Sequence, residues 1–445
     1  MIEIQNREDL ICENVARDAA GALTFAGQDL SELAETYGTP LYLYDEARIR
    51  YRMRTYLSAV EKAFGGRGHA QYASKAASFK RLYEIAAEEG MGIDVVSCGE
   101  IYTAMAAGFP LERAYFHSNN KTDADIAFAM ENGVGTIVAD NAEELYAISA
   151  EAERRGIRQR VLLRITPGID PHTYAAVATG KVDSKFGSAI ETGQAEQITA
   201  YALTLKNIAL TGFHCHVGSQ VFDSDVFLRA SEIMLDFVAD MQKKNDFFTE
   251  ELDIGGGFGV RYLDSDPEID VAANIAEIAD FMKAHCEKLH ITLPAIHMEP
   301  GRSIVADAGM TIYTAGTVKR IPGYKNYVSV DGGMADNPRF ALYGSSYTVC
   351  LANRMNAEAE GSPLFKCSVV GRCCESGDIL QENVTLPADI KRGDMIAVLT
   401  TGAYNYSMSS NYNRLGKPPV VMLKDGNDYL AVKRETVEDV CRNDI

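Results

Sequence analysis

QYASKAASFKRLYEIAAEEGMGIDVVS, residues 71–97, joins two short apolar runs through one amphipathic segment. The runs at 71–74 and 93–97 have the length of buried strands. Residues 79–90 carry apolar side chains at helical spacing and end at a glycine, as helices often do. Because parallel strands need a connection of this kind, the segment predicts one strand–helix–strand unit.

The same alternation continues along the chain. Further strand-like runs lie at 114–118, 136–140, 160–165, 210–217, 251–255 and 295–300, with amphipathic stretches between them. Eight strands alternating with helices predict a parallel (β/α)8 barrel, which we place at residues 41–305.

A different pattern follows the predicted barrel. Beyond residue 305, strand-like runs such as MTIYTAGTVKRI and FKCSVVGRCC are separated by turn signals, with little helix between them. This pattern predicts a β-rich C-terminal domain, a β-barrel or sandwich, at residues 306–445. Residues 1–40 contain the strand-like ALTFAG, and we expect this N-terminal segment to pack on the β domain.

The composition indicates a globular protein whose partner is a small molecule. Of the 445 residues, 47% are hydrophobic, and 43 basic against 62 acidic residues give a formal charge of −19. Such a charge argues against nucleic acid and anionic membranes as partners. The first residues lack the pattern of a signal peptide, and no apolar run is long enough to span a bilayer. Nine cysteines without a CxxC pair indicate reduced thiols, so we expect a cytoplasmic protein.

Polar residues gather where the predicted barrel strands end, which is where such barrels carry their chemistry. Lys75 follows the first strand, and its ammonium either extends to solvent or is used covalently, since a buried ammonium is costly. The other strand-end residues are His117, Asn119, Arg164, His214, His216, GGGFG at 255–259, Glu299 and Arg302. We expect one barrel mouth to collect them all.

Two motifs leave alternatives open. The glycine run at 255–259 lets backbone N–H groups approach a phosphate, although it also suits a tight turn; Arg302 nearby favours the phosphate site. His214 and His216 lie on one face of a strand, as metal ligands do in metal-dependent hydrolase barrels. Few further candidate ligands lie at strand ends, so a stacking or core histidine is favoured over a metal ligand.

These groups together describe a site for pyridoxal 5'-phosphate. The lysine would hold the cofactor as a Schiff base, and the carboxylate of Glu299 would keep the ring nitrogen protonated. The glycine run would receive the phosphate, and an imidazole would stack on the ring. This hypothesis gives Lys75 a covalent role and requires no metal.

Ten motifs follow one another along the chain: YASK, DVVSCGE, HSNNKT, DSKFG, HCHVGSQ, LDIGGGFG, EPGRSIVADAG, DGGMADNPRFALYG, CESGD and GAYNYSMSSNYN. With them the chain resembles the diaminopimelate decarboxylases over nearly its whole length. That family lies within the alanine-racemase-like, fold-type III class of pyridoxal-phosphate decarboxylases. The resemblance implies decarboxylation of meso-2,6-diaminopimelate to L-lysine and CO2, the last step of lysine biosynthesis.

The resemblance also implies roles for individual residues. Lys75 would form the Schiff base, and Cys374 would donate the proton after CO2 leaves, reaching the site from the other subunit of a homodimer. The cofactor would further contact His216, Ser219, Gly255, Gly256, Gly257, Glu299, Gly301, Arg302 and Tyr404. The far end of the substrate would contact Arg302, Arg339, Tyr343, Glu375 and Tyr404.

Substrate choice follows from charge. Ornithine and arginine end in a cation and favour an acidic site, whereas diaminopimelate carries a second carboxylate that Arg339 suits. The alternatives are a decarboxylase of carboxynorspermidine, ornithine or arginine on the same fold, and a pyridoxal-phosphate-binding protein without catalysis. The chain departs from the family's usual motifs, without losing a reacting group, at Ala77, Cys98, Ser118 and Cys373.

Overall fold

The chain forms two compact units. The structure, a computed structural model, describes residues 11–169, 182–354 and 363–445. One unit contains residues 52–259 and 269–303, and the other contains residues 1–51, 260–268 and 304–445.

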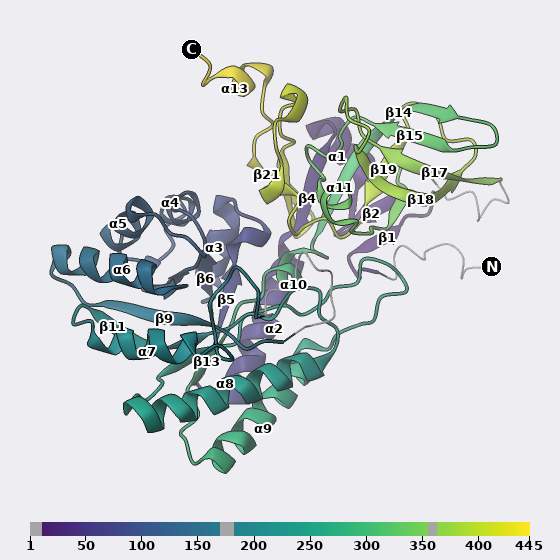
Figure 1. The fold of residues 1–445 in the computed structure, drawn as a ribbon. Coiled ribbons are helices and arrows are strands. Elements are labelled where there is room, and N and C mark those ends of the chain that lie inside the picture. The colour runs from purple at the N-terminus through teal and green to yellow at the C-terminus, as the bar shows by residue number, and fades with distance from the viewer. Residues whose placement is uncertain (1–10, 170–181, 355–362) are drawn as a thin grey trace. The chain divides into compact units, whose positions relative to one another are not determined.

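The first unit is a closed barrel of eight parallel strands (Figure 1). The strands are β5 (Gly68–Ala73), β6 (Gly92–Val95), β7 (Ala114–Phe116), β8 (Thr136–Ala139), β9 (Gln159–Thr166), β11 (Ile208–His214), β12 (Glu251–Asp253) and β13 (Ala295–Met298). Pairing of β13 with β5 and of β8 with β9 closes the barrel, and the short β10 (Ser188–Ala189) adds to β9. The predicted (β/α)8 barrel is therefore confirmed.

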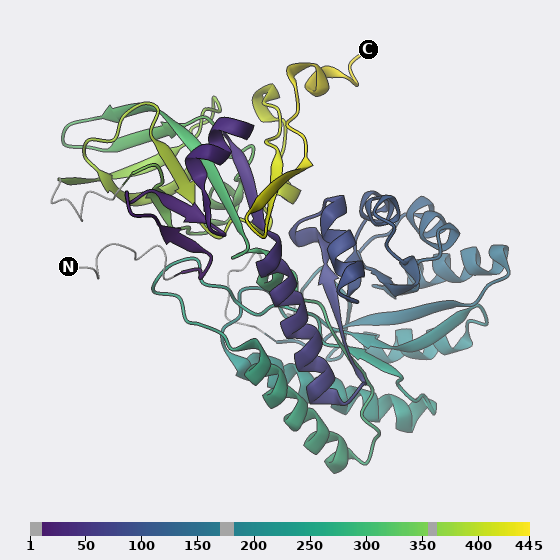
Figure 2. The same cartoon turned by 180° about the vertical axis from the view of Figure 1, so that it is seen from behind.

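Helices surround the barrel strands, as Figures 1 and 2 show for α6 to α9. They are α3 (Lys80–Glu88), α4 (Cys98–Ala106), α5 (Asp123–Glu131), α6 (Ala142–Arg155), α7 (Gln194–Thr204), α8 (Ser224–Asn245) and α9 (Val271–Leu289), while α2 (Glu46–Phe64) precedes β5 along the chain. Local signals set their ends. In α6, the Asn141 side chain accepts from the backbone N–H of Glu144, and Gly156 ends the helix in the left-handed region.

The second unit is a mixed β-sheet organised around β14 (Gly309–Arg320). β14 pairs antiparallel with β4 (Leu41–Asp45), β15 (Asn326–Val330) and β19 (Met395–Val398). The sheet also contains β16 (Val349–Leu351), β17 (Leu364–Val370), β18 (Ile379–Pro387), β20 (Val420–Lys424) and β21 (Asn427–Val432). The predicted β-rich C-terminal domain is thus confirmed.

The N-terminal strands share the core of this second unit. β1 (Val15–Arg17), β2 (Leu23–Phe25) and β3 (Gln28–Asp29) form a small sheet that leads into α1 (Leu30–Tyr37). Leu23, Phe25 and Leu30 are buried in one cluster with Ile312 and Val421. This shared apolar core joins the N-terminal segment to the β domain, as the sequence predicts.

The position of β4 differs from the prediction. The predicted domain limits of 1–40, 41–305 and 306–445 assign its residues to the barrel. β4 lies in the sheet of the second unit, between β14 and β20, and not in the barrel. All five of its residues, 41–45, are buried. A strand that is covered on both faces shows no alternation that would assign it to one sheet or another.

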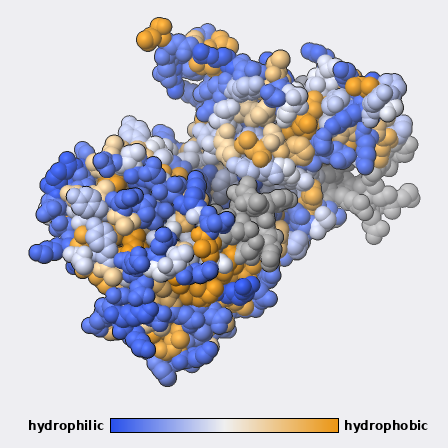
Figure 3. Space-filling view, viewed as in Figure 1, coloured by the Kyte–Doolittle hydropathy of each residue, from blue (hydrophilic) through white to orange (hydrophobic). Residues whose placement is uncertain are grey.

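The exposed surface is mainly polar. In Figure 3, hydrophilic side chains predominate on the visible face, with smaller hydrophobic patches between them. Within the described parts of the chain, no helix has both the length and the apolar character needed to cross a membrane.

Candidate active site

Lys75 lies at the carboxyl end of β5, in the single 3-10 turn Ser74–Ala76. Ser74 and Ala76 are fully buried, whereas 43% of the Lys75 side chain is exposed. Its Nζ lies 3.5 Å from Oδ2 of Asp94, a buried residue of the neighbouring strand β6. The ammonium is therefore reachable from the barrel mouth and lies beside a buried carboxylate.

Glu299 follows β13 and lies buried between two imidazoles. Its Oε1 is 2.6 Å from His117 Nε2, and its Oε2 is 3.1 Å from His214 Nε2. Burial alone raises the pKa of Glu299, but the two imidazoles hold that pKa well below its usual range. Burial lowers the pKa of His214 to about 3. Glu299 is thus ionised at neutral pH, and neutral His214 donates a hydrogen bond to it.

Asp253, at the end of β12, completes this buried polar layer. Its Oδ1 accepts from the backbone N–H of Gly255 at 2.8 Å. Burial, followed by the charge of Glu299, raises the pKa of Asp253 well above its usual value. Burial and the neighbouring charge of Glu299 therefore disfavour the ionised form of Asp253. Neither Asp253 nor Asp94 is among the predicted site residues, although each is an acid flanked on both sides by apolar residues.

The glycine run after β12 brings backbone close to backbone. Gly255 and Gly257 have positive φ values of +72° and +127°. A Cβ at Gly256 would lie 2.1 Å from the carbonyl oxygen of Glu299, and one at Gly257 would lie 2.3 Å from that of Gly218. Turn formation and close backbone packing thus both require glycine here, and the phosphate interpretation of the motif stays a prediction.

Gly256→Ala is expected to lower the free energy of unfolding, because backbone must move to admit the new Cβ. Overpacking of this kind costs about 1–3 kcal/mol. Gly99→Ala is the matched control: it lies in α4, its Cβ would lie 3.6 Å from Ser97 Oγ, an ordinary contact, and alanine favours helix. Urea denaturation measures both. Equal stability of the two variants would contradict the tight approach at Gly256.

His216, Ser219, Gly301 and Arg302 lie in the loops at this same mouth. Arg302 begins α10 (Arg302–Val305), is buried, and donates from Nε and Nη2 to Ser219 Oγ at 3.1 and 3.0 Å. A Cβ at Gly301 would lie 2.9 Å from Ala73 Cβ, so the loop after β13 packs against the turn that carries Lys75. Desolvation, followed by the charge of Lys75, holds the pKa of His216 well below its usual value.

The two histidines of the HCH motif lie in different surroundings. His214 lies with His117 and Glu299, and the potential ligand atoms of these three residues lie within 4.8 Å of one another. His216 is not part of that group. Both imidazoles contact Glu299, and the absence of a metal here stays a prediction.

A second cluster of predicted residues lies in the β unit. Arg339 begins α11 (Arg339–Tyr343) and is buried, with its guanidinium carbon 5.2 Å from the ring centroid of Tyr343 and 5.3 Å from that of Tyr404. Its Nη2 donates to Ser345 Oγ at 3.3 Å, while its Nε has no hydrogen-bond partner among the described residues. The structure thus groups three of the residues predicted to contact the substrate.

The loop that carries Cys374 is fixed by Asp378. The buried Asp378 carboxylate accepts from the backbone N–H of Cys373 at 2.7 Å and from that of Met334 at 2.6 Å. Cys373 is buried, and burial raises the pKa of its thiol to about 11. Cys374 and Glu375 are exposed. Of the two adjacent cysteines, only Cys374 presents its side chain to solvent.

The closed barrel, with a lysine, a glycine cradle and an ionised glutamate at one mouth, defines a pyridoxal-phosphate-binding barrel. Residues 47–306 match the family model described as pyridoxal-dependent decarboxylase, pyridoxal binding domain. The chain belongs to this family of pyridoxal-dependent decarboxylases. It therefore contains a pyridoxal-phosphate-binding domain and is a decarboxylase.

Similar proteins span both units. The chain is 44% identical to the diaminopimelate decarboxylase of Bacillus subtilis, over 96% of this chain and 95% of that protein. It is 42% identical to that of Staphylococcus aureus, over 95% and 98%. The crystal structure of the M. jannaschii diaminopimelate decarboxylase is similar with a TM-score of 0.88 and 30% identity, covering 98% of each chain. That of the Helicobacter pylori enzyme complexed with L-lysine has a TM-score of 0.83 and 31% identity, covering 93% and 98%.

Proposed function

We propose that this chain decarboxylates meso-2,6-diaminopimelate to L-lysine and CO2 with pyridoxal 5'-phosphate. The observation that carries the proposal is similarity across both units, because 44% identity to a diaminopimelate decarboxylase covers 96% of the chain. Similarity limited to the barrel would support a cofactor site alone. The β unit supplies Arg339 and Cys374, on which substrate choice and proton return depend in this proposal.

The barrel mouth fits the cofactor. Gly256 and Gly257 carry no side chains, so their backbone N–H groups would receive a phosphate, and the buried Arg302 adds positive charge. Lys75 is exposed enough to hold the cofactor covalently. When bound, pyridoxal phosphate stabilises the electron pair that remains on the substrate α-carbon after CO2 departs.

Residues of this chain would control the protons. Glu299 stays ionised because His117 and His214 contact its two oxygens, so it suits a proton on the cofactor ring nitrogen. Asp94 lies beside Lys75 Nζ and would stabilise its charged form. The exposed thiol of Cys374 would deliver a proton to the substrate α-carbon.

Arg339 would bind the distal carboxylate of the substrate. Its Nε and Nη2 form one edge of the guanidinium; Nε lacks a hydrogen-bond partner among the described residues, and Nη2 makes one long bond. A carboxylate matches such an edge with two parallel hydrogen bonds. The contacts with Tyr343 and Tyr404 hold the guanidinium in place.

Arg339→Ala is expected to reduce kcat/KM for diaminopimelate and leave cofactor content unchanged. Loss of a charged hydrogen-bonded pair costs on the order of 2–4 kcal/mol, or about 30- to 1,000-fold. Arg339→Lys should recover little, because an ammonium cannot form the bidentate pair. Arg320→Ala is a control, since its guanidinium also lies over a ring, that of Phe365. Unchanged kcat/KM, or loss of cofactor instead, would rule out this role.

We further infer a homodimer in which each site takes Cys374 and Glu375 from the partner, and a cytoplasmic location. Both residues are exposed in the single chain, as groups that complete a neighbour's site would be. All nine cysteines are free thiols, which suits a reducing compartment.

Two measurements test the function. Purified protein should show the visible absorbance of covalently bound pyridoxal phosphate. It should release CO2 from meso-diaminopimelate in preference to L-ornithine, L-arginine and carboxynorspermidine. Absorbance without CO2 release from any of them would favour a non-catalytic cofactor-binding protein, and preference for another substrate would favour a related decarboxylase.

A further inference from the structure

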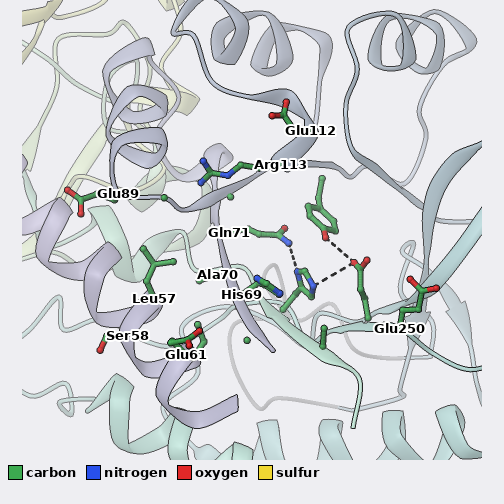
Figure 4. Close-up of a pocket in the computed structure, with 18 residues that line it drawn as sticks. Leu57, Ser58, Glu61, His69, Ala70, Gln71, Glu89, Glu112, Arg113 and Glu250 are labelled. Carbon is green, nitrogen blue, oxygen red and sulfur yellow. Dashed lines mark hydrogen bonds and ion pairs between the residues drawn. The ribbon is translucent and has the colours of Figure 1, made fainter. Parts of the chain in front are cut away.

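A second pocket opens at the opposite end of the barrel, where the strands begin (Figure 4). It has a volume of about 850 Å³ and is lined by the first residues of β5, β6, β7, β12 and β13 together with one face of α2. This volume is within the range of small-molecule sites. The barrel residues predicted to bind the cofactor follow the other ends of the strands, so this pocket is separate from theirs.

The floor of the pocket is a network of polar contacts. Gln71 Nε2 lies 2.9 Å from His297 Nδ1, and His297 Nε2 lies 3.6 Å from Glu251 Oε2, as the dashed lines in Figure 4 show. Tyr115 donates its hydroxyl to the same Glu251 oxygen at 2.9 Å, and Arg160 pairs with the other oxygen. Among the described residues, one buried side-chain atom of this network has no hydrogen-bond partner.

This atom is the carbonyl oxygen of Gln71. The carboxylate of Glu251 favours a proton on Nε2, the ring nitrogen of His297 that faces it, and Nδ1 then accepts from the Gln71 amide nitrogen. Burial lowers the pKa of His297 to about 3, which agrees with a singly protonated ring. Gln71 is only 2% exposed, and its Oε1 has no hydrogen-bond partner among the described residues. A buried acceptor left unpaired is costly, so this atom requires a donor from the pocket.

The charge of the pocket selects the kind of donor. Five glutamates line it, at positions 61, 89, 112, 250 and 251, and Arg113 is its only arginine or lysine among the described lining residues. Arg54 pairs with Glu89, and Arg113 donates to the carbonyl of Met91. Glu61, Glu112 and Glu250 are exposed at the rim, where Figure 4 labels them. The field at the opening therefore favours a cation.

We propose that this pocket is a second binding site, for a small organic cation that carries a primary ammonium group. The ammonium would donate to Gln71 Oε1 and be attracted by the rim carboxylates of Glu61 and Glu250. A short aliphatic chain would lie against the apolar parts of Leu57 and Ala70, which also line the pocket. The inference depends on the barrel alone and stands apart from the proposed substrate.

Binding of cadaverine, 1,5-diaminopentane, to the cofactor-loaded protein tests the site. Equilibrium dialysis counts the bound amine, and visible absorbance identifies any that reaches the cofactor. We expect one equivalent per chain that leaves the absorbance unchanged and weakens as salt rises. The neutral analogue 1-pentanol should not compete for it.

Variants locate the bound amine. Gln71→Met, which keeps the shape and removes the acceptor, should weaken the absorbance-silent binding about tenfold or more. Glu250→Gln should weaken it severalfold, whereas Glu153→Gln, an exposed glutamate on α6, should not. Retention of this binding in both pocket variants, its absence from the wild type, or equal competition by 1-pentanol would overturn the proposal. If Gln71→Met does not fold, Glu61→Gln combined with Glu250→Gln decides the matter, because both residues are exposed.

Discussion

Lys75→Ala protein is expected to fold, to lose covalently bound pyridoxal phosphate, and to lose essentially all turnover. The side chain of Lys75 is partly exposed at the barrel mouth, and the residues on either side of it are fully buried. Removal of a residue that reacts covalently costs on the order of 10³-fold or more in kcat. The visible absorbance of the purified variant and its rate of CO2 release measure the two losses separately.

A matched variant separates chemistry from stability. Lys80→Ala removes an exposed lysine five residues further on, at the start of α3, and should behave as wild type. Lys75→Ala also leaves Asp94 buried without its nearby ammonium, so some loss of thermal stability is expected. Adding Asp94→Asn should restore part of that stability and none of the activity. Normal absorbance and turnover in Lys75→Ala would refute the covalent role.

Mixing Lys75→Ala with Cys374→Ala protein is expected to restore about a quarter of wild-type activity from two nearly inactive proteins. If Lys75 and Cys374 of one site come from different chains, about half of the dimers are mixed after random reassortment. Each mixed dimer has one site with both residues intact and one that lacks both. The two proteins are unfolded together or co-expressed, and CO2 release is compared with that of each variant alone.

Two controls make this result decisive. Distinct affinity tags on the two variants show whether subunits have exchanged. Cys373→Ala protein is the matched control for Cys374→Ala. It should remain active on its own, because the buried Cys373 has no role in the proposed proton transfer. Activity no greater than the sum of the two variants, with exchange demonstrated, would place both residues in one chain's site or leave Cys374 without a role.

The order of strands and helices is readable from the sequence because it is a local property. Each barrel strand is a short apolar run, and each helix repeats apolar residues at its own spacing, so segments such as 71–97 predict their structure without distant partners. β4 shows the limit of prediction from local sequence patterns. Its partners β14 and β20 lie far along the chain, and its five buried residues fit any covered sheet.

The same division applies to the site. Position at a strand end, visible in the sequence, marks Lys75, Glu299 and the glycine run, and the family's motifs add Arg339 and Cys374. Contacts between strand ends required the tertiary structure, because they join residues that are far apart along the chain.

The sequence by itself determined the barrel, the β domain and the family, since periodicity and motif order are written along the chain. Only the tertiary structure decided that His117 and His214 contact the two oxygens of Glu299 and keep it ionised. The tertiary structure also showed that, at the other end of the barrel, the carbonyl oxygen of Gln71 is buried and has no hydrogen-bond partner among the described residues. Protonation and hydrogen-bond satisfaction depend on distance and burial, and barrel closure sets both by bringing separate strands together.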